Sequence, residues 1–110
     1  MGQKRTEFLR GTLDLLVLKA LSLDPLHGVG ISRRITQMTK GAFEVSFGSL
    51  FPALHRMEER GWVEAEWRSS DNNRRAKYYR LTSAGRAQLK AEERQWSRVV
   101  KIMAAAVQST

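Results

Sequence analysis

Basic side chains are concentrated between residues 68 and 80, where the chain has its clearest chemistry. This stretch holds five cations and one anion, Asp71, and so carries four of the eight net positive charges of the chain. The cations are Arg68, Arg74, Arg75, Lys77 and Arg80. Such a cluster favours a polyanion partner, nucleic acid above all. Its concentration in one segment favours a binding surface over a charge that serves only solubility.

A short amphipathic helix is predicted just before this stretch, from about residue 47 to 60. Leu50, Leu54 and Met57 recur at intervals of four and three, and Gly61 follows as a stop signal. The N-terminal boundary of this helix is left open, because Pro52 is best tolerated in a first turn while Ser46 and Ser49 are both possible N-caps. The outward residues then have groove-binding chemistry: Arg56 for a bidentate contact to guanine, and Ser49 or His55 as donors to bases or phosphates. Each of them is alternatively a solvated surface residue.

A two-stranded hairpin is predicted after the helix. Val63, Ala65 and Trp67 alternate with charged residues, a polar turn spans 69–73, and a return strand spans 76–81. A helix followed by a basic hairpin is the layout of a winged helix, and the thin tip can reach a minor groove or, more commonly, phosphates. The predicted DNA-binding residues are Ser49, Phe51, Pro52, His55, Arg56, Arg68, Arg74, Arg75 and Lys77. The aromatic residues of the hairpin can stack on bases, but strand aromatics more often pack, so we expect several to close the core (Trp62, Trp67, Tyr78, Tyr79).

Enzymatic constellations are missing from the sequence. His27 and His55 fall in different helical segments with no third metal ligand at a usable spacing, and there is no cysteine. Gly28 and Gly30 lack the strand context of a phosphate-binding loop. Adjacent glutamates, as at 58–59 and 92–93, point to different sides of a helix. The sequence therefore predicts no catalytic residues, no metal and no cofactor.

The remaining elements supply support and pairing. A buried helix is predicted from an N-cap at Thr12, with Asp14 in its first turn and residues 1–8 as a loose arm. A second helix follows over 27–38, and residues 43–45 are expected to pair with the hairpin as a brief strand. The last helix runs from Thr82 to about residue 107. Its apolar residues are spaced seven, four, three and four apart like a heptad seam: Leu89, Trp96, Val100, Met103 and Val107.

The predicted fold class is mainly α with a small β-hairpin: a winged helix-turn-helix over 9–81 and a C-terminal dimerisation helix over 82–110. The last helix can alternatively fold back on the first helix of its own subunit. The two roles are compatible, because the same helix can pack on its own subunit and form the dimer. A chain of 110 residues is narrowly stable alone, so a partner copy would help. No stretch is long and apolar enough for a membrane span or a secretory signal, so a cytoplasmic location is expected.

Three runs of sequence carry a resemblance to a known family: RGTLDLLVLKAL with HGVGI near the start, GSLFPALHRMEERGWVEAEW in the middle, and NNRRAKYYRLTSAGRAQL toward the end. The chain resembles the PadR-like transcriptional regulators over nearly its whole length. It looks most like their short, acidobacterial-type branch with a single C-terminal helix.

The resemblance implies a winged helix-turn-helix homodimer that represses, less often activates, transcription, with the 48–60 helix as reader. Val29 and Phe51 stand where the family often has tyrosine, so a phenolic hydroxyl for phosphate is absent at both positions. In some short relatives, planar aromatic drugs or phenolic compounds stack on a tryptophan of the last helix within the dimer interface. Trp96 is the matching residue, and it can equally fill the dimer seam.

The leading prediction is therefore a dimeric regulator that binds a near-palindromic operator in double-stranded DNA. By the resemblance to some short relatives, a planar aromatic small molecule is a candidate effector. The alternative is a winged helix used for protein contact, whose basic hairpin docks on an acidic partner, since fold alone does not settle function. A role in RNA binding is a weaker third.

Overall fold

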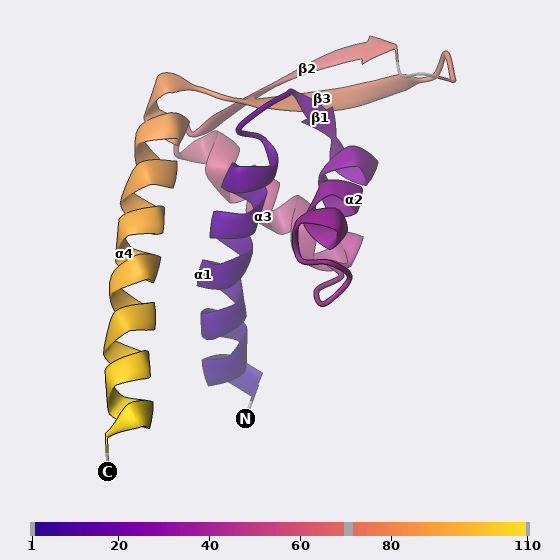
Figure 1. Ribbon diagram of the computed structural model, residues 1–110. Coiled ribbons are helices and arrows are strands. Elements are labelled where there is room, and N and C mark those ends of the chain that lie inside the picture. Colours follow the sequence, from indigo (N-terminus) through magenta and orange to yellow (C-terminus); the bar gives the residue numbers. More distant parts are fainter. Residues whose placement is uncertain (1, 70–71, 110) are drawn as a thin grey trace.

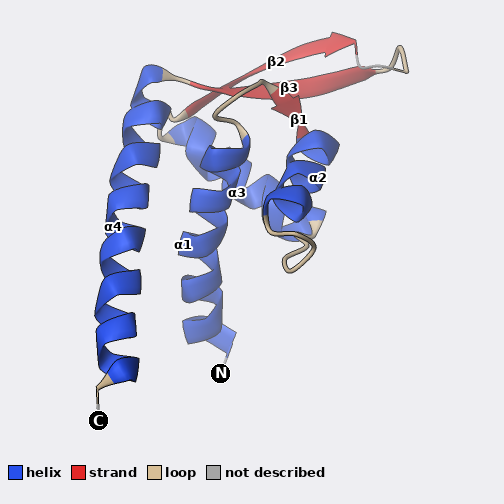
Figure 2. Cartoon of the chain, viewed as in Figure 1, coloured by secondary structure: helices blue, strands red, loops and turns tan. Residues whose placement is uncertain are grey.

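A computed structural model of the protein describes residues 2–69 and 72–109. Its elements follow in the order α1 (Gly2–Ala20), β1 (Leu26–His27), α2 (Gly28–Met38), α3 (Phe47–Glu59), β2 (Val63–Ser69), β3 (Arg75–Leu81) and α4 (Ser83–Gln108). Figure 2 shows the helices beneath one small sheet. The predicted fold class, mainly α with a β-hairpin, is confirmed.

The core lies where the first three helices meet. Val17 and Leu18 at the end of α1, and Leu21 just after it, are fully or almost fully buried. So are the apolar residues of the two following helices (Ile31, Ile35, Leu50, Leu54 and Met57). Burying each such side chain contributes about 1.5–3 kcal/mol. This packing fixes α2 and α3 relative to each other and leaves their outer faces free for binding.

The sheet is antiparallel in the order β1-β3-β2. Its hairpin pairs Val63 with Leu81 at the base and Ser69 with Arg75 toward the tip. The third strand differs from the prediction, because Leu26 and His27 pair with β3 and residues 43–45 form no strand. The reason is that Val45 is buried in the core, while both backbone groups of Phe43 bond to the Thr39 hydroxyl.

The first helix also differs from the prediction. It begins at Gly2, so Thr12 lies inside it and residues 2–8 of the expected arm are helical. The amphipathic stretch on which the prediction relied marks only the part of α1 that faces the core. Two other predicted caps are confirmed: the Ser46 hydroxyl accepts from the Ser49 N–H at 3.3 Å, and the Thr82 hydroxyl accepts from the Gly85 N–H at 3.0 Å.

Helix α4 lies antiparallel beside α1, with the two chain ends at the same end of the molecule (Figure 1). Its start is docked closely, because a Cβ on Gly85 would lie 2.0 Å from the backbone oxygen of Trp62. Leu89 is buried, which confirms that α4 folds back on its own subunit. Large apolar residues further along are exposed: Trp96, Val99, Val100, Ile102, Met103 and Val107. Within the described part of the chain, no helix has both the length and the apolar character needed to cross a membrane.

Candidate nucleic-acid interface

A basic hollow of about 640 Å³ lies between the start of α2, the first half of α3 and the hairpin. We call it the wing hollow; its lining is His27, Gly28, Val29, Arg33, Phe51, Trp67, Asn72, Arg74, Arg75, Ala76, Lys77 and Tyr79. Four of these residues are cations, and none of the described lining residues is a carboxylate. A concave surface of one sign concentrates its potential and attracts a polyanion.

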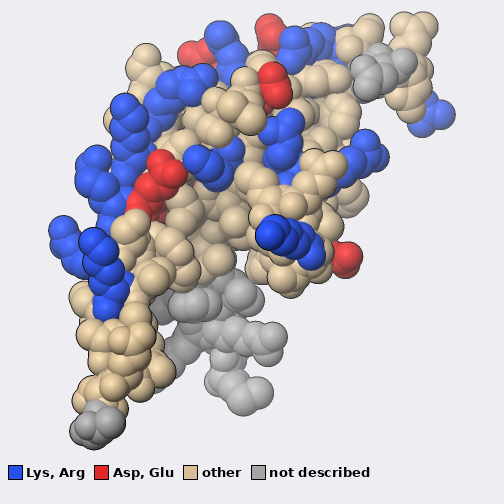
Figure 3. Space-filling view, in the orientation of Figure 1, with Lys and Arg blue, Asp and Glu red and all other residues tan. Residues whose placement is uncertain are grey.

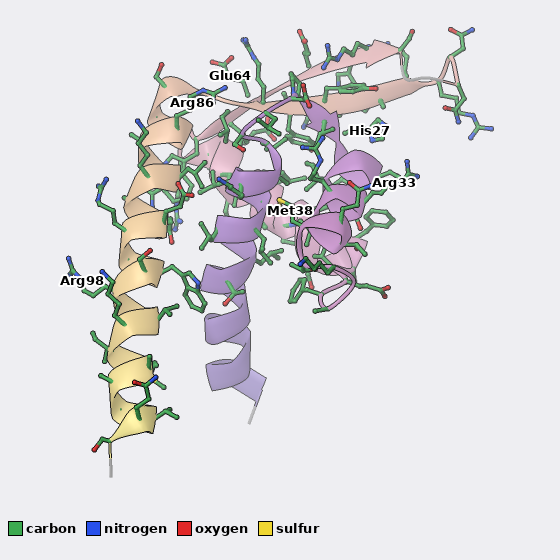
Figure 4. All side chains as sticks on the ribbon, viewed as in Figure 1. His27, Arg33, Met38, Glu64, Arg86 and Arg98 are labelled. Carbon is green, nitrogen blue, oxygen red and sulfur yellow. The ribbon has the colours of Figure 1, made fainter. Side chains whose placement is uncertain are left out.

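The start of α2 forms one wall of the wing hollow. His27 caps the helix, its Nδ1 accepting from the Gly30 N–H at 3.0 Å. Gly28 permits a close approach, because a Cβ there would lie 2.8 Å from the tip of the Phe51 ring. Figure 4 shows His27 and Arg33 on the same side of the molecule, beneath the hairpin. The start of α2 therefore brings Arg33 to the same surface as the cations of the wing.

Aromatic rings support two arginines of the wing. The Arg68 guanidinium lies 4.0 Å from the centre of the Tyr78 ring, and that of Arg75 lies 5.6 Å from the centre of the Trp67 ring. Tyr78 in turn packs edge-on against His27, with ring centres 5.1 Å apart. Contacts of this kind hold a cation in place by about 0.5–1 kcal/mol at exposed sites. They orient the charge without neutralising it.

The expectation that several hairpin aromatics close the core is confirmed for two of the four. Tyr79 is buried and Trp62 packs against the core. Burial also raises the pKa of Tyr79 above its ordinary value of 10.0, so its phenol stays protonated. Trp67, in contrast, is 60% exposed and serves the wing surface.

Arg56 does not project outward, and this prediction is wrong. Its guanidinium donates to Asp14 Oδ1 at 2.9 Å, and only 26% of its side chain is exposed. Asp14 lies in the middle of α1, where burial raises the pKa of its carboxyl above 3.8 and Arg56 only partly offsets that effect. The α1 carboxylate therefore turns Arg56 away from the outer face, and a contact between Arg56 and guanine has no geometric support.

The other residues predicted on α3 are exposed. Ser49, Phe51, Pro52 and His55 all face solvent. The Ser49 hydroxyl accepts from the Ser46 hydroxyl at 3.2 Å, and His55 Nε2 lies 3.6 Å from a Glu59 carboxylate oxygen. These four residues leave the first half of α3 open to a ligand.

Among the predicted wing cations, Arg68, Arg74 and Arg75 are exposed, whereas Lys77 is shared with α3. Lys77 Nζ lies 3.3 Å from Glu58 Oε1, with both side chains about one-third exposed. This ion pair ties the return strand to the end of α3. Part of the positive charge of Lys77 is thereby offset.

The sequence reasoning missed residues that α2 and α3 bring to this surface. Arg33 lines the wing hollow, and Phe47 is 47% exposed with its ring centre 5.8 Å from that of Phe51. The signal for Arg33 was present, because it lies on the polar face of the predicted 27–38 helix. Only the approach of the hairpin to α2, fixed by the pairing of Leu26 with Tyr79, shows that the two belong to one surface.

Trp96 lies in a different place, between α1 and α4. It lines a mainly apolar hollow of about 480 Å³ together with Gly11, Thr12, Leu15, Leu16, Glu92, Gln95 and Val99. Its side chain is 46% exposed. Among the described residues, no group of three or more histidine, aspartate or glutamate side chains has the arrangement of a metal site.

Helices α2 and α3 form a helix-turn-helix arrangement, and a basic wing follows them. This combination places the chain among the winged-helix DNA-binding proteins. The model of the transcriptional regulator PadR-like family matches residues 17–91. The chain is 34% identical to the transcriptional regulator Rv3488 of Mycobacterium tuberculosis over 88 residues, which cover 80% of this chain and 78% of that protein.

Solved structures agree. A PadR-like transcriptional regulator (BC4206) from Bacillus cereus is 26% identical with a TM-score of 0.80, over 94% of this chain and 99% of that one. A regulator from Clostridium thermocellum has the same fold, with a TM-score of 0.83 at 24% identity over 93% and 99% of the two chains. The chain belongs to the PadR-like family of transcriptional regulators. That membership supports DNA-binding regulation as its role and confirms the prediction that it is not an enzyme.

Proposed function

We propose that the protein is a homodimeric repressor that binds a near-palindromic operator through the wing hollow and the exposed half of α3. The observation that carries this proposal is the wing hollow itself, where Arg33 from α2 joins Arg74 and Arg75 from the wing with no carboxylate among the described lining residues. Figure 3 shows basic side chains over the hairpin and the adjoining helices. A phosphate backbone is the ligand that such a surface fits.

The proposed division of labour follows the elements. Residues 9–81 form the reading unit: the first half of α3 enters the major groove, where Ser49 and His55 offer hydrogen bonds and Phe51 and Pro52 offer apolar contact to thymine methyl groups. The wing cations Arg68, Arg74, Arg75 and Lys77 hold the flanking phosphates or enter the neighbouring minor groove. A regulator of this kind acts on the chromosome, hence in the cytoplasm, and blocks transcription where its operator overlaps a promoter.

Residues 82–110 are the proposed pairing helix. Trp96, Val100 and Met103 are each about half exposed, and their spacing of four and three residues places them on one face of α4. A second copy related by a two-fold axis would cover this apolar face. The two reading units would then address half-sites about 34 Å apart, one helical turn of DNA.

A planar aromatic effector is proposed for the hollow at Trp96. The site offers an indole ring, an apolar wall from Leu15, Leu16 and Val99, and the carboxylate of Glu92. We expect 9-aminoacridine to quench the tryptophan fluorescence of the wild type and of Trp62→Phe, which keeps Trp96. The double variant Trp96→Phe/Trp62→Phe should not show this quenching. Quenching that is the same in both variants assigns Trp96 to the dimer seam only.

A gel shift against the DNA upstream of the protein's own gene tests the proposed function. We expect a retarded band that survives excess nonspecific DNA and weakens steeply with salt. No retarded band at any modest salt concentration would favour the protein-contact alternative, in which the hairpin docks on an acidic partner.

The variant Arg74→Ala/Arg75→Ala tests whether the wing is part of the DNA interface. It removes two phosphate-binding cations, so affinity should fall about ten- to one-hundredfold and the slope of log affinity against log salt should decrease by about 2. Lys40→Ala/Arg60→Ala, with the same loss of charge outside the wing hollow, is the control. An unchanged slope in the wing variant would remove the wing from the interface.

A further inference from the structure

A second basic surface runs along α4, apart from the wing hollow. We call it the α4 stripe: Arg86, Lys90, Arg94, Arg98 and Lys101, at intervals of four, four, four and three residues. These intervals place all five on one side of a helix. All five are exposed, and a shallow hollow of about 650 Å³ lies over the last four of them.

The stripe is poor in internal partners. Arg86 donates to the Ser22 carbonyl oxygen at 3.3 Å, but Lys90, Arg94, Arg98 and Lys101 make no hydrogen bond or ion pair within the described residues. Among the described residues that line the shallow hollow, Glu93 is the one carboxylate, and it already lies 3.3 Å from Lys19 Nζ. Four adjacent cations with no partner repel one another, and an anionic ligand would relieve that repulsion.

The stripe has the chemistry of a phosphate backbone site rather than of a protein interface. Protein interfaces have an apolar core rich in aromatic residues. No aromatic residue is among the described residues that line the shallow hollow, which are Lys90, Glu93, Arg94, Ser97, Arg98 and Lys101. Successive cations four residues apart are separated by about 6 Å along the helix, and the row spans about 22 Å. That length matches about six steps of one DNA strand at 3.4 Å each.

The stripe cannot share the duplex held by the wing hollow of the same protomer. Figure 4 shows Arg98 pointing away from α1, on the side of the molecule opposite to His27 and Arg33. The protomer is only 26–27 Å across its two shorter axes. Duplex DNA has a persistence length of about 50 nm, so turning it around so small a body within one site is too costly.

The stripe also stays open in the proposed homodimer. The apolar residues of α4, such as Trp96 and Val100, lie on a different side of the helix from Arg94 and Arg98. Pairing the stripes themselves across a two-fold axis would oppose cations to cations. The proposed dimer therefore presents two stripes in addition to its two reading units.

We propose that the α4 stripe is a second DNA-binding surface, which holds the phosphate backbone of another duplex without reading its sequence, so that one dimer bridges two stretches of DNA. The inference rests on the proposed function only in requiring that the wing hollow hold the first duplex. It adds a further binding activity to that function.

A capture assay with the full-length protein tests the proposal. A short duplex that gives the gel shift is fixed to beads, the protein is added, and retention of a second, fluorescent duplex of unrelated sequence is measured at low salt. Arg94→Gln/Arg98→Gln is compared with Lys40→Gln/Arg60→Gln, which loses the same charge at positions outside both surfaces. We expect the stripe variant to retain about tenfold less of the second duplex, with a salt slope lower by about 2, while the control retains it like the wild type.

The outcomes separate the two proposals. A wild-type protein that gives no gel shift overturns the proposed function. A normal gel shift without capture of the second duplex, or capture that both variants lose equally, overturns the bridging proposal. So does a stripe variant with weaker binding of the short duplex itself, because the stripe would then contact the first duplex. Stripe-dependent retention of labelled polyglutamate without retention of DNA would assign the stripe to an acidic protein and overturn the proposal as well.

Discussion

The two basic surfaces of this protein are built in different ways. The wing hollow is concave and takes cations from α2 and the hairpin. The Trp67 ring supports Arg75 there, and the apolar ring of Phe51 lines the same hollow. The α4 stripe is a row of cations on a single helix, and no aromatic ring supports any of its cations within the described chain. Charge gives affinity for any backbone, whereas fixed geometry and apolar contacts distinguish one sequence from another. The hollow is therefore suited to reading and the stripe only to holding.

The largest expected effect comes from a substitution at the place where α4, which carries the stripe, packs against the base of the wing. In Gly85→Ala, the new Cβ would collide with the Trp62 carbonyl oxygen, which also accepts from the Thr82 N–H at 3.0 Å. Neither backbone group can move without separating α4 from the base of the wing. We expect the free energy of unfolding to fall by about 3 kcal/mol or more, measured by urea denaturation.

Gly48→Ala is the matched control for this change. A Cβ there meets only the Ser46 hydroxyl at 3.9 Å, and alanine is the better helix former, so stability should be unchanged or slightly higher. Equal stability of the two variants would show that α4 does not dock on Trp62 as described.

A smaller effect is expected from Arg56, which lies on α3 but belongs to neither surface. Arg56→Ala leaves the buried carboxylate of Asp14 without its partner, so the free energy of unfolding should fall by about 1–3 kcal/mol. Sequence preference should not change, because the guanidinium does not reach the outer face. Arg60→Ala, at an exposed position one turn later, should cost less. A relaxed base preference in Arg56→Ala, with stability unchanged, would restore Arg56 to the reading surface.

Arg56 also shows where sequence reasoning stops. Spacing on α3 correctly assigned Leu50, Leu54 and Met57 to the core, because a period of 3.6 residues requires only the local helix. It could not assign Arg56, whose direction is decided by Asp14, 42 positions away in sequence.

The same limit explains why the third strand was predicted at the wrong place and why Arg33 was not predicted as a site residue. Residues 43–45 had the composition of a strand, but Val45 is buried in the core and the Phe43 backbone bonds to Thr39, so the segment does not pair with β3. Arg33 had the chemistry of a binding residue, but its membership of the wing hollow depends on long-range pairing of β1 with β3. Elements with a strong period and a cap, such as α4 after Thr82, were predictable from residues close in sequence.

The support of wing cations by rings gives the next effect in size. Trp67→Leu removes the ring beneath Arg75 at a position that is 60% exposed, so stability should change little. Operator affinity in a gel shift should fall about two- to fivefold, corresponding to the loss of about 0.5–1 kcal/mol of cation–π contact. Trp67→Tyr keeps a ring and should retain most of the affinity. An equal loss of affinity in both variants would mean that the indole contacts DNA directly. If neither variant lost affinity, the ring would not orient the cation.

The smallest expected effect is a pH dependence that reports how Arg56 is held. Burial raises the pKa of Asp14 above 3.8, its ordinary value, so the folded protein binds this proton more tightly than the unfolded chain does. As pH rises from 3.8 through the raised value, ionisation of Asp14 should therefore lower the free energy of unfolding. Asp14→Asn removes this titration while its amide oxygen still accepts from Arg56. In urea denaturation, stability of the variant minus that of the wild type should rise with pH in the range just above 3.8 and then level off. A difference that falls with pH would mean that Arg56 outweighs burial, and that the ion pair, rather than the surrounding apolar packing, fixes the orientation of α3 beneath the wing hollow.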